Sequence, residues 1–279
     1  MKILSSKKIQ DACYALIEQA CTSIAPSCIN AMQKASATEE NSSAKFALDI
    51  LLQNAELAQK EKLPICQDTG FAIFFVNIGR DVYIQGNLEE AIQNAVRQGY
   101  NDFYLRKSVC DPLTRVNTTD NTPANIHIEF TAGDSVEILF MPKGFGSENM
   151  SKLFMLTPAQ GIDGILNAIV QTVQDAGSNP CPPIIVGVGI GGTFDSAPLL
   201  AKKALLREVG NHHAREDIKQ LEIEALARIN ALQIGAQGFG GSTTALAVHM
   251  EVAPTHIAGL PVAINIQCHC MRIAKTVID

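Results

Sequence analysis

Residues 63–79 read "LPICQDTGFAIFFVNIG" and join a polar, reactive loop to an apolar run. The loop places a thiol, an amide, a carboxylate and a hydroxyl side by side, from Cys66 to Thr69. The apolar run that follows is rich in aromatic and branched residues, as in a buried strand. A cysteine two residues from a carboxylate indicates a metal ligand beside an acid–base group. The alternative for Asp68 is ordinary turn chemistry, because Asp-Thr-Gly is a common turn sequence.

The chain before this loop is predicted to be helical. Over about residues 6–62, apolar side chains recur every three or four residues, as on the buried face of a helix. The polar stretch "TEENSSAK" breaks this region and offers capping residues for the next helix. We therefore expect a helical N-terminal region at about 1–62.

After the loop, the pattern alternates between strands and helices. Residues 71–84 are predicted to be extended, and 87–100 helical with Asn87 as the N-cap. Residues 126–140 are predicted to form a β-hairpin around "AGDS". Later segments predict helices at about 158–176 and 215–232, and a strand, glycine turn and helix in "IIVGVGIGGTFDSAPLL". Two further strands are expected, one after "GAQGFGGSTT" and one in "LPVAINIQ".

These elements predict an α/β (α+β) fold, in which a mixed β-sheet flanked by helices follows the helical region. We see no internal repeat and no linker, so one domain over 1–279 is the simplest organisation.

Composition excludes some classes of function. The formal net charge is −6, which argues against general nucleic-acid binding. No run approaches the roughly 20 apolar residues that span a bilayer, and Asp11 and Glu18 interrupt any apolar core of a secretion signal. We expect a cytoplasmic protein, whose eight cysteines are thiols or metal ligands rather than disulfides.

Three cysteines lie where a loop meets regular structure: Cys66, Cys181 and Cys268. They are too far apart in sequence for a compact zinc knuckle, but single distant ligands suit a cluster at the meeting point of several elements. Three thiolates would leave a [4Fe–4S] cluster with one open iron. The alternative is that these are core or loop thiols, and spacing alone does not exclude Cys270 as a ligand.

Other segments could bind a polar ligand. Residues 105–127 are dense in Arg, Asp, Asn and Thr, and either form an exposed loop or contact a carboxylate through Arg106 or Arg115. The segment "GVGIGGTFD" lacks the glycine order of a dinucleotide fingerprint, so we reject a nicotinamide site. A lone histidine such as His256 is usually a core or surface residue. The histidines at 212 and 213 are interpreted as the exposed approach to a helix.

Six motifs occur in order from about residue 40 to the end: "PICQDTG", "DPLTRVNTTDNTPANIH", "PKGFGSENMS", "NPCPPIIVGVGIGGTFD", "GAQGFGGSTTALAVH" and "PTHIAGLPVAINIQCHCMR". Together they resemble the class I (iron–sulfur) fumarate hydratases, and within them the α subunit of the two-subunit form. The α subunit of L(+)-tartrate dehydratase is a near relative of that form. The resemblance implies the fold of the class I fumarase N-terminal domain.

The resemblance also implies roles for individual residues. The three ligands of a [4Fe–4S] cluster fall on Cys66, Cys181 and Cys268. The acid–base residue falls on Asp68. The implied substrate contacts are Gln67, Arg106, His256 and, through its backbone, Gly146.

The implied activity is the reversible hydration of fumarate to (S)-malate by an oxygen-sensitive hydro-lyase. Single-chain members of the family continue with a second domain, whereas this chain stops at Asp279. We therefore expect a separate β subunit that completes the site, in an α2β2 assembly, and a small dicarboxylate substrate. The alternatives are dehydration of tartrate to oxaloacetate, or a non-catalytic assembly subunit that binds a structural metal.

Overall fold

The computed structural model describes residues 2–279, which form two compact units. Unit 1 contains residues 2–24, 54–145 and 272–279, and unit 2 contains residues 25–53 and 146–271. Each unit is assembled from separate stretches of the chain. This is why no linker can be seen in the sequence.

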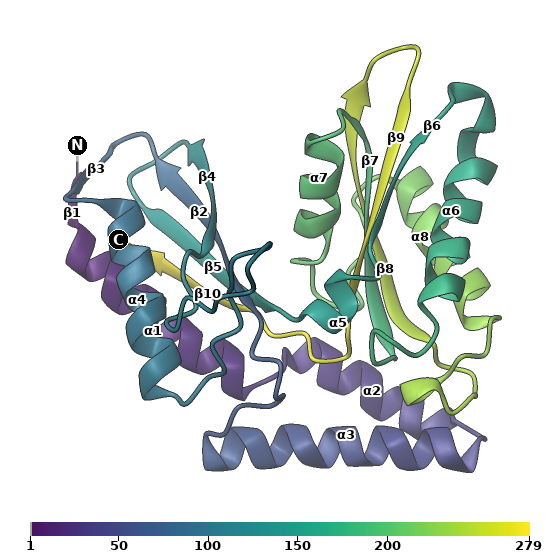
Figure 1. The fold of residues 1–279 in the computed structure, drawn as a ribbon. Coiled ribbons are helices and arrows are strands. Elements are labelled where there is room, and N and C mark those ends of the chain that lie inside the picture. Colours follow the sequence, from purple (N-terminus) through teal and green to yellow (C-terminus); the bar gives the residue numbers. More distant parts are fainter. Residues whose placement is uncertain (1) are drawn as a thin grey trace. The chain divides into compact units, whose positions relative to one another are not determined.

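Unit 1 is a four-stranded mixed sheet with helices α1 and α4, the last part of α3 (from residue 54) and a small two-stranded sheet (Figure 1). The large sheet has the strand order β10-β5-β2-β4, and β1 pairs with β3. The elements are β1 (Lys2–Ser5), α1 (Ser6–Thr22), β2 (Phe71–Gly79), β3 (Val82–Gln85), α4 (Leu88–Asp102), β4 (Asn125–Thr131), β5 (Val136–Lys143) and β10 (Ala274–Ile278).

The predicted hairpin at 126–140 is wrong. Both strands exist, but β2 lies between them, parallel to β4 and antiparallel to β5. The interior of β2 is almost completely buried, so it needs a neighbour on each side. A central strand that is apolar on both faces takes the place that local sequence proximity would give to a hairpin partner. β4 is consequently an edge strand.

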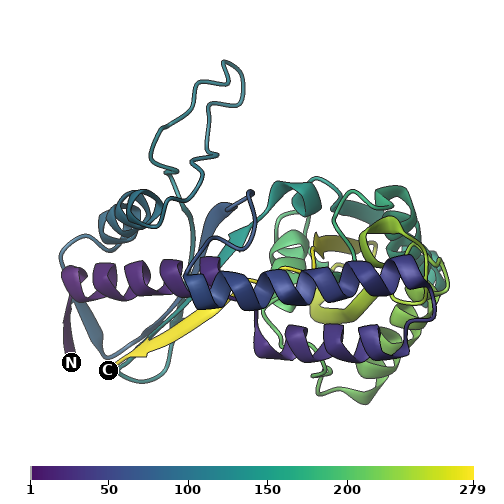
Figure 2. The same cartoon turned by 90° about the horizontal axis from the view of Figure 1, so that it is seen from below.

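The helices of unit 1 follow the predicted pattern. The buried face of α1 repeats every three or four residues and includes Ile9, Cys13, Leu16 and Ile17, which pack against α4 and the sheet. The Asn87 side chain accepts a hydrogen bond from the Glu90 N–H and so caps α4, as predicted. Residues between α4 and β4 form an irregular, largely exposed loop, which extends away from the sheet in Figure 2.

Unit 2 has three layers. Its sheet has the order β6-β9-β7-β8, with α7 on one face and α6 and α8 on the other (Figure 1). The elements are α2 (Pro26–Thr38), the first part of α3 (Ser42–Glu61), α5 (Phe145–Glu148, whose first residue belongs to unit 1), β6 (Lys152–Leu156), the 3-10 turn Pro158–Gln160, α6 (Gly161–Ala176), β7 (Ile184–Gly192), α7 (Ser196–Ala204), α8 (Glu216–Asn230), the 3-10 turn Ala236–Gly238, β8 (Ala245–Thr255) and β9 (Leu260–Gln267).

Glycines inside β7 let α7 approach the sheet closely. A Cβ at Gly187 would lie 2.2 Å from the Ala201 carbonyl oxygen, and one at Gly189 would lie 2.2 Å from that of Ala197. The glycine pattern of "GVGIGG" therefore serves helix–sheet packing. Short β1, β6 and β10 were not predicted, because strands of four or five residues carry too little alternation to stand out.

Helices α2 and α3 run side by side in both views, and small residues of the two share a core with Ala236 (Figure 2). Within residues 2–279, none of the helices combines the length and hydropathy needed to cross a bilayer.

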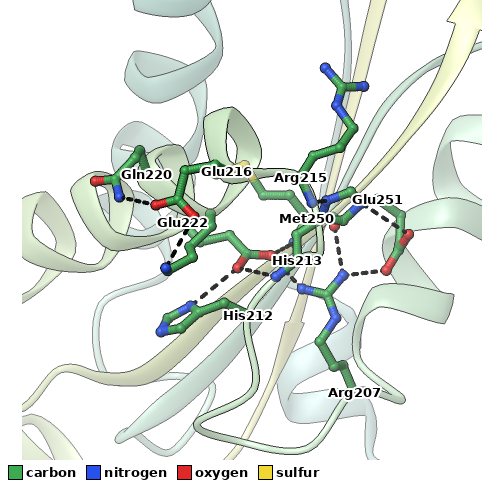
Figure 3. A network of polar contacts seen from close by, with 10 residues as sticks. Arg207, His212, His213, Arg215, Glu216, Gln220, Glu222, Met250 and Glu251 are labelled. Carbon is green, nitrogen blue, oxygen red and sulfur yellow. Dashed lines mark hydrogen bonds and ion pairs between the residues drawn. The ribbon is translucent and has the colours of Figure 1, made fainter.

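A buried carboxylate holds the segment between α7 and α8 against β8 (Figure 3). Glu222, on α8, has a fully buried side chain. It accepts hydrogen bonds from the backbone N–H groups of Met250 at 2.8 Å and His213 at 3.0 Å, and it pairs with the Arg207 guanidinium. Arg207 also donates to the Met250 carbonyl and to the Glu251 carboxylate. One anion thus connects a helix, a strand and a loop.

Burial by itself would raise the pKa of the Glu222 carboxyl. The hydrogen bonds from Met250, His213 and Arg207 outweigh that effect, so the pKa is lowered. The interpretation of His212 and His213 as an exposed approach to a helix is correct for His212, which is exposed just before α8, and wrong for His213, whose side chain is only 15% exposed. Both residues contact this network.

We expect Glu222→Gln to lower the free energy of unfolding by about 2–4 kcal/mol at pH 7, because it removes the buried charge that pairs with Arg207 and accepts from the Met250 and His213 N–H groups, and leaves Arg207 only its pair with Glu251. The folded-state pKa of Glu222 is lowered, so its stabilisation is present above the unfolded value near 4.5 and is lost as pH falls through the folded value. The cost of the substitution should therefore shrink in acid. Urea unfolding at several pH values measures both effects.

Glu216→Gln is the matched control, because Glu216 is an exposed residue at the start of the same helix and pairs only with neighbours along it. It should leave the urea midpoint almost unchanged. Equal midpoint shifts for the two variants would contradict a special role for the buried carboxylate.

Candidate functional site

The loop that precedes β2 is held in unit 1 by backbone contacts from three directions. The Ile65 N–H donates to the Cys21 carbonyl at the end of α1. The buried Tyr100 hydroxyl lies 3.1 Å from the Thr69 carbonyl and 3.0 Å from that of Gly70. Gly70 has φ +83, and a Cβ there would lie 2.7 Å from the backbone of Pro142. The loop therefore depends on a glycine at this position.

Asp68 is fixed by two backbone donors. One carboxylate oxygen accepts from the Gly70 N–H at 3.1 Å, which is the local turn contact. The other accepts from the Phe145 N–H at 2.8 Å, which is a contact between distant parts of the sequence. The Gly70 contact agrees with the interpretation of Asp68 as a turn residue. The Phe145 contact adds a second, long-range hydrogen bond that a turn residue would not need.

Two buried cations accompany Asp68 in unit 1. Arg272, 2% exposed, donates to the Asp68 carbonyl at 2.9 Å. A Cβ on Gly144 would lie 3.1 Å from an Asp68 carboxylate oxygen and 3.5 Å from an Arg272 terminal nitrogen. Lys143 is fully buried next to this glycine. A buried arginine in contact with the Asp68 loop and a buried lysine next to Gly144 add local positive charge to a chain whose formal net charge is −6.

The remaining predicted residues of unit 1 surround the same loop. The Cys66 sulfur lies 3.7 Å from the Gln67 side-chain oxygen. The Arg106 carbonyl accepts from the Thr69 hydroxyl at 2.8 Å, so Arg106 is tied to the loop through its backbone while its side chain is exposed. Unit 1 therefore brings together four predicted residues, namely Cys66, Gln67, Asp68 and Arg106.

In unit 2, the register of the sheet places two predicted ligands at the same end of the strands. β7 and β9 are antiparallel, and Ile185 pairs with Gln267. Cys181 precedes the start of β7, and Cys268 follows the end of β9. Two residues remote in sequence are therefore neighbouring loop positions in space.

A histidine between the two cysteine-bearing loops holds them together. The His269 Nδ1 lies 2.9 Å from the Cys181 carbonyl oxygen. A carbonyl only accepts, so Nδ1 carries the proton and donates. The Gln237 side chain lies 3.4 Å from the same ring and donates to the Pro182 carbonyl at 2.7 Å. From the other side, the buried Cys28 thiol of α2 donates to the His269 carbonyl at 3.2 Å.

Gly146 also lies at this end of the unit 2 sheet. A Cβ built on it would be 3.6 Å from the Asn179 carbonyl oxygen, in the loop that carries Cys181. An ordinary contact at that distance leaves room for a side chain, so Gly146 is not required there for steric reasons.

His256 lies at the opposite end of unit 2. It follows β8 in the turn that leads to β9, whereas Cys268 follows the last residue of β9. Eight residues of strand separate the two ends, roughly 26 Å at about 3.3 Å per residue. The predicted substrate contact of His256 stays a prediction.

Burial separates the cysteines into two groups. Cys13, Cys21 and Cys28 are buried, and burial raises the pKa of each thiol to about 12, so they are inert core groups. Cys270 is buried as well. The three predicted ligands, by contrast, are exposed or partly exposed, as is Cys110, which was not predicted to be a ligand. Accessible thiols at loop ends are a donor set that fits an iron–sulfur cluster.

No group of three or more His, Cys, Asp or Glu side chains within residues 2–279 is arranged to hold a metal ion. The predicted ligands are shared between the units, with Cys66 in unit 1 and the other two in unit 2.

Sequence reasoning missed the residues that support the site: Lys143, Gln237, His269 and Arg272. His269 and Arg272 lie in the motif "QCHCMR", and Lys143 opens "KGFGS", so their positions inside dense motifs were the available indication. Their burial and contacts could not be derived from spacing.

Comparison with known proteins shows the family of the chain. A family model described as "Fumarate hydratase (Fumerase)" matches residues 10–277.

Among curated proteins, the chain is 43% identical over 274 residues to a Methanocaldococcus jannaschii protein named "Putative L(+)-tartrate dehydratase subunit alpha", with 96% of each chain covered. It is 30% identical over 238 residues to the "L(+)-tartrate dehydratase subunit alpha" of Escherichia coli O157:H7, which covers 84% of this chain and 78% of the relative. The corresponding protein of E. coli strain K12 is 29% identical over the same length.

We expect Gly70→Ala to destabilise the protein by about 2–4 kcal/mol, because the added carbon meets the Pro142 backbone as well as imposing a left-handed conformation on alanine. Thermal and urea unfolding measure the change.

Gly133→Ala is the matched control in unit 1, because Gly133 has φ +100 and open space where a Cβ would lie. It isolates the conformational cost, about 1 kcal/mol. If both variants lost the same stability, close approach of the loop to Pro142 would not be the constraint.

Proposed function

The chain belongs to the fumarate hydratase family as a hydro-lyase α subunit, and we propose that its substrate is L(+)-tartrate. The observation that carries the choice of substrate is the 43% identity to a relative named as a tartrate dehydratase α subunit, over 96% of both chains. This replaces the expectation of fumarate as the main substrate.

We further propose that Cys66, Cys181 and Cys268 hold a [4Fe–4S] cluster. Support comes from their accessibility, in contrast to the buried thiols, and from the His269 hydrogen bond that holds the loops of Cys181 and Cys268 together. Three thiolates would leave one iron of such a cluster without a protein ligand, and when bound the cluster would supply Lewis-acid chemistry for a leaving hydroxyl.

The chain's own residues orient the substrate and move a proton. Dehydration removes a hydroxyl from one carbon and a proton from the next. The Asp68 carboxylate, aimed by the N–H groups of Gly70 and Phe145, accepts that proton. The exposed Arg106 guanidinium grips a substrate carboxylate in bidentate fashion, and Gln67 and the Gly146 backbone supply hydrogen bonds. Arg272 and Lys143 favour a dianionic substrate over neutral competitors.

The relatives are named as α subunits, which implies a β subunit partner. We propose that a β subunit supplies the remaining substrate contacts, in an α2β2 assembly.

The test is anaerobic production of the chain together with its β subunit, reconstitution with iron and sulfide, and turnover of L-tartrate, (S)-malate and fumarate. We expect kcat/KM for L-tartrate to exceed that for malate by at least tenfold, and the chain without its β subunit to be almost inactive. Asp68→Asn should lower kcat by about 10²–10⁴-fold with iron content unchanged.

Fumarate hydration is the second candidate, because the family model that matches residues 10–277 carries that activity in its description. Preference for malate or fumarate in the same assay would establish it and overturn the tartrate proposal. A colourless protein that retains zinc and turns over none of the three would remove both.

We expect His269→Ala to weaken iron retention by about 10–100-fold, as for other groups that orient metal ligands, because it frees the Cys181 loop from the Cys268 loop. His269→Asn keeps an N–H donor near the Nδ1 position and should restore most of the retention. Iron and sulfide per chain and the visible spectrum are the measurements. Equal retention by all three proteins would show that the histidine does not position the ligands.

A further inference from the structure

The edge strand β4 of unit 1 carries one exposed charge, Glu129, and otherwise lacks the protection that exposed sheet edges normally have. β2 lies on one side of it, and no strand of residues 2–279 lies on the other. Its register with β2 is continuous over seven residues, without a bulge. The strand reads "NIHIEFT" and contains no Lys, Pro or Gly. The opposite edge, β10, does carry a lysine, Lys275, which pairs with Glu137. Unprotected flat edges pair with other strands.

The apolar face of the unit 1 core continues onto this edge without cover. Ile128 and Phe130 lie beside Val76 and Ile78 of β2, which are buried in the core. Yet Ile128 is 46% exposed and Phe130 is 71% exposed. Helix α1 packs chiefly on β5 and β10, the half of the sheet away from β4. The edge thus combines open backbone groups with uncovered apolar side chains.

The direction of the backbone groups can be read from one hydrogen bond. The Thr131 carbonyl accepts from the Arg80 N–H, so residue 131 faces β2. The direction of the backbone N–H and C=O groups alternates along a strand. The odd-numbered residues of β4 therefore bond to β2, and the backbone N–H and C=O groups of the even-numbered residues point away from β2. The outward set is Ile126, Ile128 and Phe130, the same residues that carry the apolar side chains.

We propose that two copies of this chain pair through β4, antiparallel, about a two-fold axis at Ile128. In this register each Ile128 faces the partner's Ile128, and Ile126 faces the partner's Phe130. On the other face of the strand, His127 lies opposite the partner's Glu129. The free backbone groups of the even-numbered residues on one strand therefore lie opposite those on the other, as an antiparallel ladder requires.

Charge selects this register over its neighbours. Moving the axis to residue 129 places Glu129 on the partner's Glu129, and moving it to residue 127 places His127 on the partner's His127. Two Glu129 carboxylates directly opposite each other are destabilising, whereas a His127 pair loses its carboxylate partner, and both shifts also shorten the overlap of the two strands. His127 stacks on Phe75 at 5.0 Å, and Glu129 lies beside Asn77, so neighbouring residues of β2 limit how far either side chain can move.

The pair joins two four-stranded sheets and places an α–α contact in the assembly. It does not depend on which substrate the enzyme uses, so failure of the tartrate proposal leaves it intact. A seven-residue strand buries less than a standard interface, so we expect dimerisation in the micromolar range for the chain alone.

Sedimentation velocity of the full-length chain over a range of concentrations tests the proposal. We expect reversible formation of a species of two copies, and Ile128→Lys should raise its dissociation constant about tenfold or more, since lysine is a natural blocker of sheet edges. Val277→Lys is the matched control, because Val277 is 49% exposed on the opposite edge strand β10. It should leave the dissociation constant within about twofold of the parent value. Urea unfolding verifies that both variants are folded.

The register has its own test. His127→Glu alone places like charges across the axis and should weaken the dimer about threefold or more, while the double exchange His127→Glu with Glu129→His restores it. Amide exchange in residues 125–131 should be slow in the parent dimer and fast in Ile128→Lys. A monomer at every concentration overturns the proposal. So does a dimer that is insensitive to Ile128→Lys, or slow exchange at β4 that appears only when the β subunit is bound.

Discussion

The antiparallel register of β7 and β9 is the constraint on which the unit 2 part of the site depends. Pairing Ile185 with Gln267 brings the loops of Cys181 and Cys268 to one end of the sheet, although the two cysteines lie 87 positions apart along the chain. A one-residue slip would turn every buried side chain of β9 to the wrong face, so the buried faces of β9 hold the register. Glycines at 187 and 189 let α7 cover one of those faces closely. The proton of His269 then fixes the two loops to each other.

Unit 1 holds the Asp68 carboxylate among polar and charged groups, just before the buried strand β2. Gly70 lets the loop pass against the Pro142 backbone, and the buried Tyr100 hydroxyl lies within hydrogen-bond distance of the Thr69 and Gly70 carbonyls. Asp68 is aimed by backbone N–H groups, which have fewer alternative conformations than side chains. Such an arrangement is pre-organised, so little reorganisation is needed when an anionic ligand arrives.

The two four-stranded sheets are built in the same way, but their edge strands differ in how far they are covered. In each, a strand buried on both faces takes the centre and displaces a pairing that sequence proximity would suggest. In unit 1 this places β2 between β4 and β5 and leaves β4 at an edge with its apolar face open. In unit 2 the buried Glu222 ties α8 and its preceding segment onto the edge strand β8. One edge is therefore secured from within the chain, and the other is available to a second copy.

The sequence by itself determined the α/β class, most helices and long strands, the N-cap at Asn87 and the family, because these depend on local periodicity and on motifs that can be read in order. It also pointed to Cys66, Asp68, Cys181 and Cys268, since reactive residues at loop–strand junctions stand out against an apolar background. Only the tertiary structure decided that β2 separates β4 from β5, that His256 lies at the far end of β9 from Cys268, and that Arg272 and Lys143 are buried beside Asp68. Those facts arise from strand order and burial, which are set by contacts between residues distant in sequence and leave no periodic trace in it.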